Sequence, residues 1–177
     1  MGPFGHCAVG LAAKPVAPKV PIGILFLATV ILDVLAIAFA FAGIESVETG
    51  IPWSHGLFMS VIWSLVAAFL AARIYRDHRA GVVVGLLVFS HWVLDFISHP
   101  IPFSSFSWRS WQWSFGHPLP PDLPLLFAGS PRVGLGLYNS VSAAEATVLE
   151  FGMLILGGVV YVTYAVRCKR SRGAQFG

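Results

Sequence analysis

Long apolar runs separated by short polar stretches dominate the pattern of this chain. Four runs approach the roughly 20 residues that an α-helix needs to cross the hydrocarbon core of a bilayer. They cover residues 21–43, 56–75, 80–99 and 146–166. A further apolar run at residues 3–13 stops before Lys14 and is too short to span. We therefore predict an all-α, polytopic membrane protein, a four-transmembrane-helix bundle with a short N-terminal apolar helix.

Composition supports a membrane protein and narrows its class. Hydrophobic residues make up 56% of the chain and charged residues 11%, whereas soluble domains average about 25% charged residues. The length of 177 residues suits a single integral membrane domain. The net charge of +3 is small and its charged residues are scattered, which argues against nucleic-acid binding. No basic region precedes the first apolar run, so we expect no secretory signal. The two cysteines lack the CxxC spacing of a thiolate metal site.

The basic residues predict how the helices are oriented. Nine of them fall in three clusters, which are Lys14 and Lys19; Arg73, Arg76 and Arg79; and Arg167, Lys169, Arg170 and Arg172. Four spans put all three clusters on one side, which the positive-inside rule makes cytoplasmic. We therefore predict an inner-membrane protein with both termini in the cytoplasm. Residues 44–55 and 100–145 become extracytoplasmic.

The second extracytoplasmic segment begins with an unusual stretch at residues 100–131, rich in Pro, Ser and aromatic residues. Its Trp108, Trp111 and Trp113 are typical of side chains in the headgroup layer. Two interpretations remain open for this aromatic loop. It either anchors the bundle at the interface or covers a site as a lid.

The residues SHWVLDFISH, 90–99, carry the strongest chemical signal. His91, Asp95 and His99 are spaced by four, which places them on one face of a helix. Imidazole and carboxylate groups on one stripe can bind a divalent metal. Ionisable side chains inside a membrane are costly and usually functional. This stripe predicts a metal site within the third span.

The other predicted spans carry polar residues at a similar depth. Asp33 lies in the first span, His55 opens the second with Ser54 as its expected N-cap, and Glu150 lies in the outer part of the fourth. A divalent ion can neutralise several such groups at once. Alternatively, these residues hydrogen-bond helix to helix, and His99 is simply interfacial. His6 falls on the cytoplasmic side unless the short N-terminal helix is re-entrant.

Several short motifs, taken in order, resemble the membrane-bound metal-dependent hydrolases, also described as LexA-binding, inner-membrane-associated hydrolases. They are GHCAVGLAAK (5–14), LD (32–33), SHGL (54–57), SHWVLD (90–95), SH (98–99) and PDLPLLFAGSPRVGLGLYNS (121–140). The resemblance implies a helical bundle and a metal-dependent hydrolase. It also implies that the metal ligands come from His6, Asp33, His55, His91, Asp95 and His99.

Our first hypothesis is a hydrolase that uses Zn, Mn or Fe to cleave a lipid or another membrane-borne ester or phosphoester on the extracytoplasmic side. Asp33 then serves as a ligand or general base. Supporting or substrate-binding roles fall to Glu150, Asp122, Asn139 and Arg132. One alternative is a non-enzymatic subunit, in which the polar residues stabilise packing against a membrane partner or a second copy. Another is an oligomeric carrier of metal ions or protons.

Overall fold

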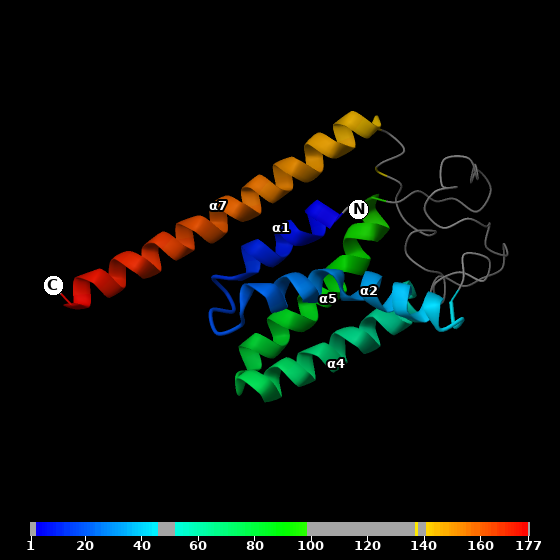
Figure 1. The fold of residues 1–177 in the computed structure, drawn as a ribbon, viewed down its shortest axis with the longest axis horizontal. Coiled ribbons are helices and arrows are strands. Elements are labelled where there is room, and N and C mark those ends of the chain that lie inside the picture. Colours follow the sequence, from blue (N-terminus) through cyan, green and yellow to red (C-terminus); the bar gives the residue numbers. More distant parts are fainter. Residues whose placement is uncertain (1–2, 46–51, 99–136, 138–140, 177) are drawn as a thin grey trace.

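The computed structural model describes residues 3–45, 52–98, 137 and 141–176. Its helices are α1 (Pro3–Ala13), α2 (Ile22–Phe41), α3 (Pro52–His55), α4 (Leu57–Tyr75), α5 (His78–Ser98) and α7 (Ala143–Phe176). Figure 1 shows that these helices form a bundle in which α7 extends beyond the others. The described part of the chain contains no strand, which confirms the all-α prediction.

Four of these helices are long and apolar enough to cross a membrane. They are Ile22–Phe41, Leu57–Tyr75, His78–Ser98 and Ala144–Ser171. The predicted bounds are close for the first three, whereas α7 begins earlier and ends later than expected. Ser142 and Glu145 explain the early start because they form a capping box, in which the Ser142 N–H donates to Glu145 Oε2 at 2.7 Å. Residues 143–145 of the predicted loop are thus helical, and most of that loop lies outside the described residues.

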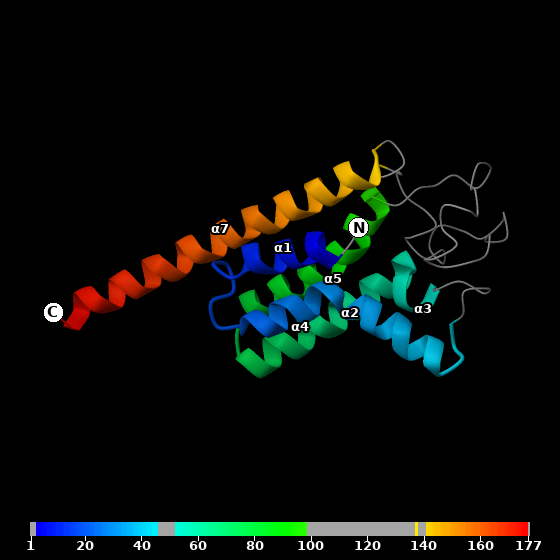
Figure 2. The same ribbon diagram turned by 45° about the horizontal axis from the view of Figure 1, so that its top comes forward.

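The short helix α1 is confirmed and lies inside the bundle. It contacts α7, α2 and α5 (Figure 2). Glycines allow this close approach, since a Cβ on Gly157 of α7 would collide with the Ala8 carbonyl. A Cβ on Gly10 would lie 3.2 Å from the Leu25 carbonyl oxygen of α2. The main chain of α1 can therefore pack tightly enough to bury His6, which is 2% exposed.

The helices α4 and α5 form a tight antiparallel hairpin. Arg76 ends α4 in the left-handed region with φ 49°, and its N–H donates to the Ala72 carbonyl. Asp77 then accepts the N–H of Arg79 at 2.9 Å at the start of α5. A Cβ on Gly81 would lie 2.6 Å from the Ala68 carbonyl oxygen, so glycine is needed where the two helices cross.

One end of the bundle gathers the described basic clusters. Lys19, between α1 and α2, forms an ion pair of 3.0 Å with Asp77, between α4 and α5. In both views the C-terminal half of α7, which carries Arg167, points to this same end. This arrangement places the described members of all three clusters toward the same end of the bundle, as predicted. Which side of a membrane that end faces stays a prediction.

Candidate metal centre

The candidate site lies where α1, α2, α3 and α5 meet. His91 and Asp95 are one turn apart on α5 and are 1% and 4% exposed. Asp33 lies on α2, about 17 Å along the helix from Ile22 at 1.5 Å per residue. His55 is the last residue of the one-turn helix α3, and His6 projects from α1. Residues from four helices thus converge at one point, where all of them except Asp33 are buried.

Asp33, His55 and His91 form the first group whose ligand atoms lie together. The Nε2 atoms of His55 and His91 are 3.3 Å apart. Asp33 Oδ1 lies 3.4 Å from His55 Nε2 and 3.5 Å from His91 Nε2. These three atoms therefore form a nearly equilateral triangle, with each side chain supplying one corner.

The hydrogen bonds behind the two imidazoles determine which nitrogen of each carries a proton. His91 Nδ1 lies 2.7 Å from the Thr29 carbonyl oxygen, which can only accept, so Nδ1 is the protonated atom. His55 Nδ1 lies 2.9 Å from the Ser54 hydroxyl. That hydroxyl donates its proton to a Glu45 oxygen at 2.8 Å, so it must accept from Nδ1. In its neutral form, each ring therefore directs an Nε2 lone pair into the triangle.

A divalent cation could occupy this arrangement. Charge-assisted N–H···O bonds are about 2.7–2.9 Å long, and the 3.4 and 3.5 Å contacts to Asp33 are clearly longer. Two lone pairs and a carboxylate at this separation repel one another in the absence of positive charge. The donor set of two imidazoles and one carboxylate is one that divalent transition metals accept.

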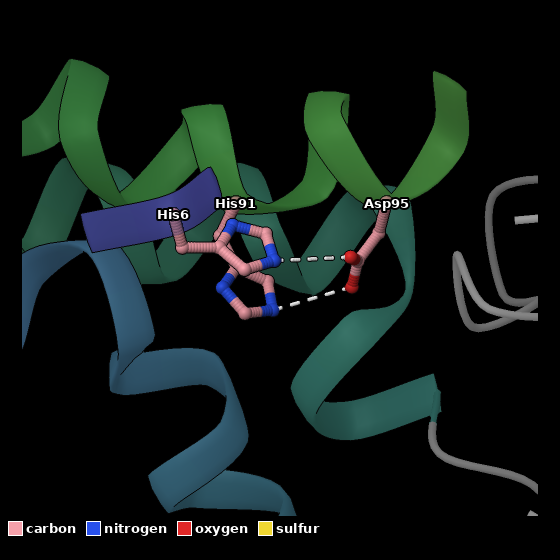
Figure 3. A group of neighbouring side chains, drawn as sticks. All are labelled: His6, His91 and Asp95. Atoms are coloured by element: carbon pink, nitrogen blue, oxygen red, sulfur yellow. Dashed lines mark hydrogen bonds and ion pairs between the residues drawn. The ribbon is translucent and has the colours of Figure 1, made fainter. Parts of the chain in front are cut away.

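A second group consists of His6, His91 and Asp95 (Figure 3). His6 Nε2 lies 3.2 Å from Asp95 Oδ1, and His91 Nε2 lies 3.3 Å from Asp95 Oδ2. The His6 and His91 rings stack with their centroids 4.0 Å apart. Among the described residues, His6 Nδ1 has no hydrogen-bond partner. Asp95 thus lies between the two rings, with one oxygen directed at each.

The two groups share a single coordinating atom. His91 can offer only Nε2, since its Nδ1 donates to Thr29. An ion bound in one group therefore uses the lone pair that the other group would need. The arrangement can hold one ion on His91.

The structure thus brings together Asp33, His55, His91, Asp95 and His6, including the residue that spacing alone left undecided. Glu150 is buried on α7 but belongs to neither group. The remaining candidates lie outside the described residues; they are His99, Asp122, Arg132 and Asn139.

Sequence reasoning missed the groups behind the imidazoles. The prediction that Ser54 caps the second span is wrong, because Gly56 occupies the N-cap of α4 without a side-chain bond. Ser54 instead connects His55 with Glu45, a residue of the segment 44–55 that we predict to be extracytoplasmic. The Thr29 contact uses a backbone carbonyl, for which a sequence carries no signal.

Comparison with known protein families, curated proteins and solved structures gave no match for this chain.

Proposed function

We propose that this protein is a membrane-embedded hydrolase that holds one divalent ion on Asp33, His55 and His91. In this proposal, its substrate is a lipid-borne ester or phosphoester. The observation that carries the proposal is the triangle of ligand atoms, into which two oriented Nε2 lone pairs point. The resemblance in sequence motifs supports the same class of activity.

The side lengths of the triangle favour a tetrahedral ion such as zinc. Zn–N bonds of 2.0–2.1 Å with tetrahedral angles separate two ligand atoms by about 3.3 Å. An octahedral ion with bonds of 2.0–2.1 Å, such as magnesium, would bring adjacent ligands to about 2.9 Å. The three sides measure 3.3, 3.4 and 3.5 Å. We therefore infer zinc-like coordination by these three side chains.

Three protein ligands leave a coordination position free, which is the pattern of catalytic rather than structural zinc sites. When bound, such an ion lowers the pKa of water towards 7 and polarises an ester or phosphoryl oxygen. Asp95 lies beside this proposed ion, since its Oδ2 is 3.3 Å from His91 Nε2, and it would accept the proton of the bound water. His6 holds the other oxygen of Asp95. Asp33 is thereby assigned as a ligand and Asp95 as the general base.

The accessibility of the site supports a substrate that comes from the membrane. The Asp33 side chain is 47% exposed, whereas those of His55 and His91 are 1% exposed. Asp33 also lies about 12 Å from the Phe41 end of α2, well within the span. Its exposed neighbours Val34 and Ile37 are apolar. A substrate approaching Asp33 along this face therefore needs an apolar body.

Metal analysis of purified protein tests the proposed ligands. We expect about one zinc per chain in the wild type after dialysis, and loss of that zinc in His55→Ala. His6→Ala should keep the ion, because His6 contacts Asp95 rather than the triangle. A wild type that retains no zinc would refute the proposal. Zinc retained by His55→Ala but lost from His6→Ala would place the ion in the other group.

Hydrolysis is tested with paired probes in detergent micelles. We expect zinc-loaded protein to cleave a fluorogenic long-chain ester or phosphoester faster than its short-chain, water-soluble analogue. Asp33→Asn should abolish the difference between zinc-loaded and chelator-treated protein. If fully loaded protein turns over none of the probes, the bound ion stabilises the bundle, and the non-enzymatic alternative replaces the hydrolase.

A further inference from the structure

A buried carboxylate lies behind the proposed ligands, in the segment that follows α2. Glu45 is 2% exposed. Its Oε1 atom accepts the N–H groups of Trp53 at 2.6 Å and of Ser54 at 2.8 Å. Its Oε2 atom accepts the Ser54 hydroxyl at 2.8 Å. The charge of Glu45 is therefore satisfied by donors that all belong to α3.

The chain of hydrogen bonds continues from Ser54 to the imidazole of His55. Ser54 is 0% exposed, and its Oγ lies 2.9 Å from His55 Nδ1. A hydroxyl has one proton, and an ionised carboxylate can only accept. Since the Ser54 proton goes to Glu45, the bond to His55 runs from Nδ1–H to Oγ. His55 is thereby held as the tautomer that leaves its Nε2 lone pair facing Asp33 and His91.

We propose that Glu45 and Ser54 are positioning residues that set the tautomer and orientation of His55 for metal binding. This inference rests on the proposed metal site. Metal-bound histidines commonly donate their second ring N–H to a carboxylate or carbonyl, and removing that partner weakens metal affinity by 10- to 100-fold. Here a serine hydroxyl is interposed between the ring and the carboxylate, so both residues must be present for the chain to work.

A simpler role for Glu45 would be to cap the start of α3. The two roles use different oxygens, because the backbone N–H groups bind Oε1 and the hydroxyl binds Oε2. A Glu45→Gln variant separates them. The amide oxygen of Gln can still accept both backbone N–H groups, but its NH₂ group can only donate to Ser54. The Ser54 proton must then turn to His55 Nδ1, which moves the ring proton to Nε2 and blocks the ligand atom.

The first experiment records the ¹⁵N NMR shifts of histidine in the metal-free protein, with His55→Gln used to assign the signals of His55. We expect the Nδ1–H tautomer in the wild type and the Nε2–H tautomer in Glu45→Gln, with unchanged helix content. If His55 has the same tautomer in both proteins, the positioning role is wrong. This measurement uses no metal, so it stands whether or not the metal site exists.

The second experiment measures zinc affinity by chelator competition and the visible spectrum of the cobalt-loaded protein. We expect Ser54→Ala and Glu45→Gln to weaken zinc binding at least 10-fold and to alter the cobalt bands. Ser60→Ala is the matched control, because Ser60 is equally buried and its hydroxyl has no hydrogen-bond partner among the described residues. It should bind within twofold of the wild type.

The outcomes separate this inference from the proposed function. Zinc binding by the wild type that Ser54→Ala leaves unchanged refutes the positioning role and leaves the metal site standing. A wild type without zinc refutes the metal site. The tautomer measurement then decides whether the hydrogen-bond chain from Glu45 to His55 operates as we infer.

Discussion

Replacing Asp33 with asparagine distinguishes a metal ligand from a residue that only joins helices. Asparagine keeps the size of the side chain and removes its negative charge. At a pH that keeps both imidazoles neutral, Asp33 Oδ1 faces the two lone pairs of His55 and His91 without a proton to share. In metal-free protein the substitution therefore relieves repulsion, and we expect Asp33→Asn to unfold at the same temperature as the wild type or above it.

The stabilisation by zinc should fall steeply in the same variant. An ion present at 100 times its dissociation constant stabilises the folded state by about 2.7 kcal/mol. Weakening the affinity 100-fold reduces this to about 0.4 kcal/mol at the same zinc concentration. With roughly 2–4 °C of melting temperature per kcal/mol for a chain of this size, the zinc-induced shift should drop from about 5–11 °C to about 1–2 °C.

Thermal unfolding in detergent, followed by circular dichroism with and without zinc, measures both effects. Asp77→Asn is the matched control, because Asp77 lies at the α4–α5 turn and pairs with Lys19. It should keep the full zinc-induced shift. If Asp33→Asn lowers the melting temperature of the metal-free protein and keeps the zinc shift, Asp33 serves helix packing and the reasoning is refuted.

Other substitutions probe the packing, the charged turn and the proposed base. Gly157→Ala should destabilise the protein by about 1–3 kcal/mol in thermal unfolding because its Cβ meets the α1 backbone, whereas Gly158→Ala, in open space, should stay within about 0.5 kcal/mol. The hydrogen bond from Lys19 holds the pKa of Asp77 below its usual value, so its stabilising effect is present above about pH 4 and is lost as the pH falls through the lowered pKa. An NMR titration of the Asp77 carboxyl checks this. Its pKa should lie below the usual value at low salt and return towards that value at high salt. Asp95→Asn should retain zinc while turnover of the long-chain probe falls roughly 10²- to 10⁴-fold, measured at saturating zinc.

Apolar run length and helical spacing were enough to predict most of the fold. The four spans and the short N-terminal helix follow from the number of consecutive apolar residues. The contact between His91 and Asp95 follows from their i,i+4 spacing on one helix. Both features depend on the geometry of a single helix, so they can be predicted from the order of residues along the chain.

Contacts between helices were harder to predict. The position of His6 depends on the packing of α1 inside the bundle. Small residues such as Gly157 allow this packing, but a small residue in a sequence does not show which helix packs against it. Serine is common at helix N-caps, where its oxygen accepts a backbone N–H, but the Ser54 hydroxyl instead donates to the buried Glu45. Such pairings depend on which helix faces meet, and hydrophobic patterning alone does not determine them.

X-ray absorption at the zinc edge of the metal-loaded protein tests the central claim most directly. We predict a coordination shell at about 2.0–2.2 Å with two imidazoles and at least one oxygen. The His55→Ala variant should lose one imidazole from that shell or the ion altogether. A wild-type spectrum with oxygen ligands alone, or with sulfur from Cys7 or Cys168, would contradict an ion held by Asp33, His55 and His91.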